Sequence, residues 1–95
     1  MFIVTLTYKA PTELVDAHRP AHREWLDPHV ASGLFLVTGP TNPRTGGVLI
    51  VSDRISRDDL AALLTEDPFH IHGIADVAIV EMEANKVTPA LQGRL

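Results

Sequence analysis

Hydrophobic and polar residues alternate or recur in six stretches of the chain. Four of these stretches are short and rich in β-branched and aromatic residues, which is typical of strands, and they cover residues 2–8, 34–38, 46–52 and 74–82. Residues 14–31 are rich in helix formers, and Leu60, Leu63 and Leu64 recur at helical spacing along one side of a second helix. The pattern therefore predicts the order strand, helix, strand, strand, helix, strand.

The first helix contains residues that start, interrupt and stop helices. Thr12 is the expected N-cap, and Gly33 is the expected C-terminal cap, because glycine adopts the left-handed backbone conformation at low cost. Pro20 and Pro28 fall inside the segment, and an internal proline removes a backbone hydrogen bond and bends a helix. We therefore expect either one kinked helix or two short helices that meet near Arg19.

The second helix has its own boundary signals. Ser56 followed by Asp59 resembles a capping box, which favours a helix start at this point. Pro68 is expected to stop the helix and to hold Asp67 in an extended conformation, because the residue before a proline disfavours the helical region. The short segment after Pro68 is then expected to be extended as well.

This order of elements is the split β-α-β pattern of ferredoxin-like folds, which places both helices on one face of a four-stranded antiparallel sheet. The predicted fold class is therefore α+β, with the order βαββαβ in a single domain over residues 1–95. The tail, from about residue 85 to residue 95, has no clear period. We expect it to be extended or to lie at a subunit interface.

The predicted strands carry apolar side chains on both faces of the sheet. In an antiparallel sheet with one solvated face, that face is normally polar. One layer of helices covers only one face, so we expect the other to bind a second copy of the chain. A charge at Val4 or at Ile50 is expected to disrupt this homodimer. The alternatives are that the open face is only moderately apolar or that the tail covers it.

Composition narrows the classes of function. The formal net charge is −4, and no run of lysine or arginine stands out, which argues against nucleic acid and anionic membranes as partners. The absence of cysteine excludes disulfides, thiolate metal sites and a cysteine nucleophile. No signal peptide and no apolar run of about 18 residues is recognisable, so a cytoplasmic protein is expected.

Five histidines are many for a chain of 95 residues. One helical stripe holds His18, His22, Trp25 and His29. Its first two histidines are at positions i and i+4, the spacing at which histidine pairs bind metal ions in zinc enzymes. His70 or His72 could supply a third ligand from an extended segment. No glutamate or cysteine motif accompanies them, so a polar helix face is the plainer interpretation, and no bound metal is expected.

His22 has a second interpretation. Histidine exchanges protons near neutral pH, but acid–base catalysis requires a partner that orients the ring, usually a carboxylate. Asp67 is a candidate, because the end of the second helix approaches the first helix in this topology. The plain alternative is a surface histidine and an aspartate that merely ends a helix.

A set of short motifs resembles the YciI-like family, which belongs to the dimeric α/β-barrel superfamily. The motifs are Arg19-Pro20-Ala21-His22, Gly33-Leu34-Phe35-Leu36, Gly39-Pro40, Asp67-Pro68-Phe69 and Gly73. The resemblance implies a ferredoxin-like homodimer and a pocket in which His22 and Asp67 form a catalytic dyad. Residues expected to bind substrate around them are Arg19, Trp25, Gly39, Pro40 and Phe69.

The resemblance also implies a reaction. At least one family member is a dehydrochlorinase that acts on a chlorinated hydroxyquinol. For this chain we therefore expect cofactor-independent acid–base chemistry, of a lyase or dehydrochlorinase type, on a small cyclic or phenolic compound. The short loop at residues 41–45 and Pro28 depart from the longer members and are expected to reshape the pocket.

Two other functions compete with this hypothesis. The first is a non-catalytic dimeric module that binds a small molecule or a partner through the same cleft. The second is a metal-dependent enzyme that uses the histidine stripe. A cavity beside His22 with polar groups converging on it would favour the acid–base enzyme, whereas His22 packed flat under Trp25 without a cavity would favour the binding module.

Overall fold

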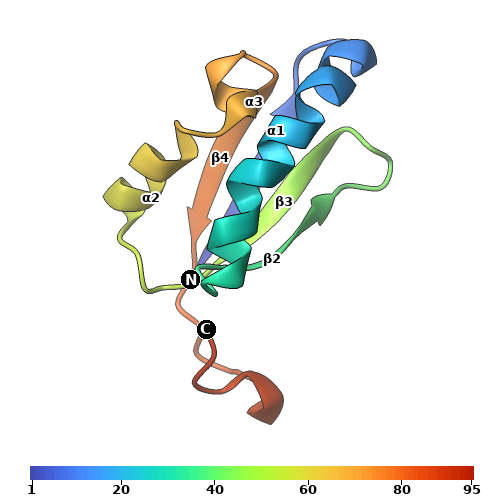
Figure 1. Cartoon of the computed structure of the whole chain (residues 1–95). Helices are drawn as coiled ribbons and strands as arrows, with labels where there is room; N and C mark the ends of the chain where they lie inside the picture. Colours follow the sequence, from blue (N-terminus) through green and yellow to red (C-terminus); the bar gives the residue numbers. More distant parts are fainter.

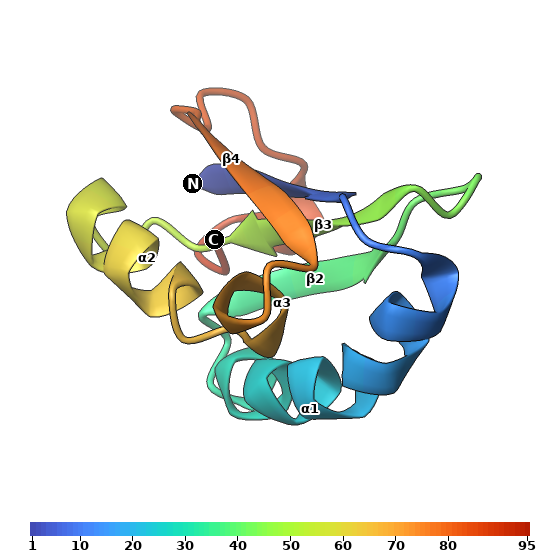
Figure 2. The same cartoon turned by 90° about the horizontal axis from the view of Figure 1, so that it is seen from above.

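The computed structural model describes residues 1–95 and has the predicted order of strands and long helices (Figure 1). Its elements are β1 (Phe2–Tyr8), α1 (Thr12–Ala31), β2 (Phe35–Pro40), β3 (Gly46–Val51), α2 (Arg57–Leu64), α3 (Pro68–Ile71), β4 (Ala75–Glu81) and the 3₁₀ turn η1 (Pro89–Leu91). The four strands form one antiparallel sheet in the order β2-β3-β1-β4. All three α-helices lie on the same side of this sheet (Figure 2). The α+β ferredoxin-like prediction is confirmed.

The hydrophobic core lies between the sheet and the helices. Its centre is β1, whose Phe2, Val4 and Leu6 are buried and face α1 and α2, while Ile3 and Thr5 point to the opposite face. The prediction that a charge at Val4 would test the homodimer is therefore wrong. Val4 has no exposed surface, so a lysine there would disrupt the core of each subunit rather than an interface.

Helix α1 is one continuous helix over Thr12–Ala31, so the alternative of two short helices is wrong. Pro20 and Pro28 are both exposed, and the carbonyl groups that lose an amide donor on that side can bind water instead. The expected N-cap is also wrong, because the helix is preceded by Pro11 and no side chain caps it. Gly33, with φ of 79°, ends the helix as predicted.

The segment between α2 and β4 differs from its prediction. The Ser56 side chain accepts a hydrogen bond from the Asp59 amide at 3.1 Å, which confirms the helix start. Asp67 is extended, as expected, but Pro68 begins α3 instead of an extended stretch. A proline at the first helical position needs no amide donor and already has a helical φ angle. His70 consequently lies in α3 and His72 follows its end, so the two do not flank an extended segment.

The face of the sheet opposite the helices is uncovered, and part of it is apolar. One row of side chains crosses all four strands in register and consists of Val37, Ile50, Ile3 and Val80. Val37 is 63% exposed and Val80 is 56% exposed. The tail lies beyond the end of the sheet, and the hydrogen bonds formed by residues 85–95 stay within the tail (Figure 1).

Candidate active site

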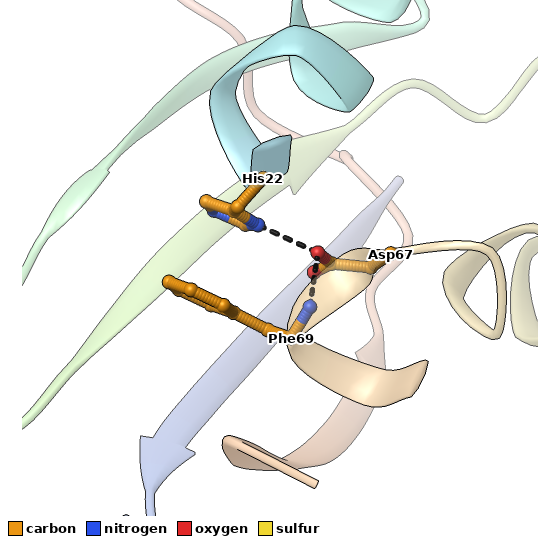
Figure 3. Close-up of polar contacts among 3 residues, drawn as sticks. All are labelled: His22, Asp67 and Phe69. Carbon is orange, nitrogen blue, oxygen red and sulfur yellow. Dashed lines mark hydrogen bonds and ion pairs between the residues drawn. The ribbon is translucent and has the colours of Figure 1, made fainter. Parts of the chain in front are cut away.

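His22 and Asp67 meet although 45 positions of sequence separate them. The Nδ1 atom of His22 lies 2.7 Å from Oδ1 of Asp67, and both residues are buried, with 8% and 1% of their surfaces exposed (Figure 3). An ionised carboxylate can only accept a hydrogen bond, so in this contact Nδ1 carries the hydrogen and donates the bond to Asp67. The other ring nitrogen, Nε2, forms no hydrogen bond with the protein and is not enclosed by it.

The short helix α3 orients this pair. Asp67 is the N-cap of α3, and its Oδ1 also accepts a hydrogen bond from the Phe69 amide at 3.0 Å (Figure 3). The Phe69 ring stacks on the His22 ring, with centroids 4.1 Å apart and an angle of 4° between the planes. One local motif, Asp67-Pro68-Phe69, therefore supplies both the carboxylate and the surface against which the imidazole lies flat.

A cavity of about 580 Å³ adjoins the pair. Its lining residues come from α1, the three strands β1, β2 and β3, and α3: Leu6, Tyr8, Arg19, His22, Arg23, Leu26, Asp27, Val30, Ala31, Thr38, Gly39, Pro40, Gly47, Val48 and Phe69. Of the expected substrate-binding residues, Arg19, Gly39, Pro40 and Phe69 line it. Trp25 does not, and Asp67 lies behind His22. Arg23 and Asp27 are exposed, so the cavity opens to solvent near them.

The sequence interpretation missed several lining residues on α1. Arg23, Leu26, Asp27 and Val30 lie at offsets of 4, 7, 8 and 11 from Arg19, which is the spacing of one helix face. Taking Arg19 as the start of the stripe, instead of His18, would have found them. The lining residues on β1 and β3 carried no such signal, because their position depends on how the sheet packs under α1.

The other histidines of the predicted stripe make separate contacts. The His18 ring stacks on His72 with centroids 4.2 Å apart, and His29 packs against Trp25 and Phe35. No group of three histidine, cysteine or acidic side chains is arranged to hold a metal ion. Trp25 also packs on Phe35, and its indole nitrogen is buried without a hydrogen-bond partner.

The fold and the site together define a class of protein: a small ferredoxin-like α+β domain with a histidine–carboxylate pair at the wall of a cavity. A family model described as the YCII-related domain matches residues 1–83. The chain belongs to this family, which confirms the resemblance inferred from its motifs.

Comparison with solved structures shows the same fold in an enzyme. The chain is similar to the 5-chloro-2-hydroxyhydroquinone dehydrochlorinase TftG from Burkholderia phenoliruptrix AC1100, solved in complex with 2,5-dihydroxybenzoquinone. The two share 22% sequence identity with a TM-score of 0.71, over 87% of this chain and 94% of that one. No curated protein matches the chain. None of its helices is both long and apolar enough to cross a membrane.

Proposed function

We propose that this protein is a cofactor-independent acid–base enzyme that acts on a small cyclic or phenolic compound in the cavity. His22 transfers the proton through Nε2, and Asp67 orients the ring. The observation that carries the proposal is the buried contact of 2.7 Å between Nδ1 and Asp67 beside a cavity of about 580 Å³. A space of this size suits a single small-molecule ligand.

The geometry supports a defined proton transfer. Because Nδ1 donates to Asp67, the lone pair on Nε2 is available to take a proton, and the carboxylate stabilises the imidazolium that forms. In an elimination of HX from a hydroxylated ring, the reacting species is a keto tautomer in which X is bonded to an sp3 ring carbon and a hydroxyl group is conjugated to that carbon through one ring double bond. The hydroxyl proton passes to Nε2 and the electrons of the O–H bond form a carbonyl group. The ring double bond shifts by one position, and X⁻ leaves with the electrons of the C–X bond.

The competing binding module would use the same cavity without chemistry. His22 packs flat against Phe69, not under Trp25, and it borders a cavity that also contains two arginines and Asp27. A cavity that holds His22 together with these polar groups favours the acid–base enzyme. The likeness in fold to a dehydrochlorinase supports the elimination type of reaction.

The function is tested with 5-chloro-2-hydroxyhydroquinone and a panel of related halogenated and hydroxylated rings. We expect release of chloride, or a change in ring absorbance, for at least one compound. The rate should be unchanged after incubation with EDTA, and elemental analysis should find no stoichiometric zinc, nickel or iron, since the proposed chemistry uses only side chains. About one metal per chain, lost in His18→Ala together with activity, would instead establish the metal-dependent alternative.

We also propose that the active form is a homodimer joined through the open face of the sheet. The apolar row formed by Val37, Ile50, Ile3 and Val80 supports this arrangement, because contiguous exposed apolar surface of this kind usually marks an interface. The Ile50→Glu variant should give monomers or insoluble protein. Ala61→Glu, at an exposed position of α2, is the matched control and should leave the assembly unchanged. Size exclusion with light scattering distinguishes these outcomes, and a monomeric wild type at micromolar concentration would refute the proposal.

A further inference from the structure

Most lysine and arginine side chains of the folded domain have a hydrogen-bond or ion-pair partner, although only Lys9 and Arg44 have a carboxylate. Lys9 lies 2.9 Å from Asp76, Arg54 donates to Ser52 and Ser32, and Arg57 donates to the carbonyl of Ile79. Arg44 donates to Asp16 at 2.5 Å, and this hydrogen bond raises the pKa of the Arg44 guanidinium. The remaining cations without a partner are Arg19, Arg23, Lys86 and Arg94.

These four unpaired cations divide into two pairs. Lys86 and Arg94 belong to the tail. Arg19 and Arg23 both line the cavity, on the same face of α1 as His22. Every lysine or arginine between residues 1 and 81 that lacks a partner is therefore at the candidate active site. These two guanidinium groups form no hydrogen bond or ion pair with the protein, so their donors are available to a ligand in the cavity.

The two arginines are placed to bind the same group. They are four residues apart, which puts their Cβ atoms about 5–6 Å from each other on the helix surface. Arg19 is half-buried and Arg23 is exposed. The planar guanidinium donates two parallel hydrogen bonds to a carboxylate or a similar oxyanion, and it keeps its charge at any physiological pH.

The acidic groups near the cavity do not cancel this charge. Asp27 is the one carboxylate among the lining residues, and it forms no ion pair with either arginine. Asp67 does not line the cavity and is already bonded to His22 and to the Phe69 amide. The lining thus carries two fixed positive charges against one negative charge, in a chain whose formal net charge is −4.

The rest of the lining suits an apolar ring. Leu6, Leu26, Val30 and Phe69 supply aliphatic and aromatic surface next to the arginines. We infer that the cavity selects a cyclic compound that carries an anionic oxygen group, a carboxylate or a phenolate, which Arg19 and Arg23 bind while the ring lies against the apolar wall beside His22. The inference rests on the proposed function in so far as it takes this cavity as the substrate site. The same guanidiniums would stabilise negative charge that develops on the ring oxygen as His22 removes a proton.

A pair of probes that differ only in charge tests the inference without a known substrate. 2-Naphthoate and 2-naphthamide have nearly the same size and shape, but only the first is an anion at neutral pH. Binding is followed by calorimetry and by amide NMR shifts at low and at high salt. We expect naphthoate to bind about 10-fold or more tightly than naphthamide, with shifts at α1 and β2, and we expect high salt to weaken only naphthoate.

Variants assign the charge preference to the two arginines. Arg19→Gln and Arg23→Gln should each weaken naphthoate binding several-fold, and the double variant should bind both probes equally. Arg19→Lys should retain part of the preference for naphthoate, because lysine keeps the positive charge but cannot donate the two parallel hydrogen bonds of a planar guanidinium. Arg94→Gln removes an unpaired cation in the tail and is the matched control, with no expected change.

Three outcomes would overturn the inference: equal binding of the two probes to the wild type, a preference that survives the double variant, or no binding of naphthoate at its solubility limit. The measurement is independent of turnover, and it is repeated in His22→Asn. If the preference is present but His22→Asn turns over an identified substrate normally, the acid–base function is wrong and the anion site stands. If turnover depends on His22 but naphthamide binds as well as naphthoate, the anion inference alone fails.

Discussion

His22→Asn and Asp67→Asn are each expected to lower the turnover of a substrate of the cavity by about 10²-fold or more. The first variant removes the base that receives the proton. The second removes the negative charge that stabilises the imidazolium, although an asparagine oxygen can still accept the hydrogen bond from the Phe69 amide. Asp67→Asn should therefore keep the cap of α3, and its loss of activity reports on the charge rather than on the fold.

Two histidines on the same helix provide matched controls for this series. His18 stacks on His72, and His29 packs against Trp25 and Phe35, so neither borders the cavity. His18→Asn and His29→Asn should keep the rate within about twofold of the wild type, since they remove no group that touches the reacting atoms. Full activity in His22→Asn, with normal thermal unfolding, would show that the pair is architectural and that the proposed acid–base role of His22 is wrong.

Gly46→Ala should destabilise the fold by about 3 kcal/mol or more. A Cβ atom at Gly46 would lie 1.8 Å from the backbone oxygen of Leu6 and 2.9 Å from its backbone carbon. Gly46 pairs with Thr7 at the end of the ladder between β3 and β1, so the two backbones can separate only by breaking hydrogen bonds between these neighbouring strands. Denaturant unfolding measures the difference in the free energy of unfolding.

Gly39→Ala is the control for the same substitution in the neighbouring strand. A Cβ atom at Gly39 meets no other atom within 4 Å, and its backbone is outside the left-handed region, so stability should change by only about 0.5 kcal/mol. Equal stability of the Gly46→Ala variant and the wild type would mean that the close approach of β3 to β1 is not as described. Both variants also probe the cavity wall, because Leu6 and Gly39 line it.

Local patterns in the sequence were sufficient for the order of elements and for the fold class. Alternation in residues 2–8 and the leucine spacing in α2 depend only on which side of a strand or helix meets the core. Ser56 and Gly33 also mark their helix ends as predicted, because capping involves atoms only a few residues apart. The same local rules left two alternatives open at Pro20 and Pro28 and failed at Pro68, since whether a proline ends, bends or begins a helix depends on what surrounds it.

The candidate site was only partly readable from the sequence. The motifs identified His22 and Asp67 as candidates, but nothing in the order of residues says that two side chains 45 positions apart lie at 2.7 Å. That distance, the stacking of Phe69 on the imidazole and the enclosure of a cavity by α1, α3 and three strands follow from how the helices pack on the sheet. The pairing of charges has the same origin, because a free guanidinium is recognised only when every carboxylate in the folded chain has been located. Periodicity, which is a property of neighbours along the chain, determined the fold, whereas the site depends on contacts between distant segments that exist only after packing.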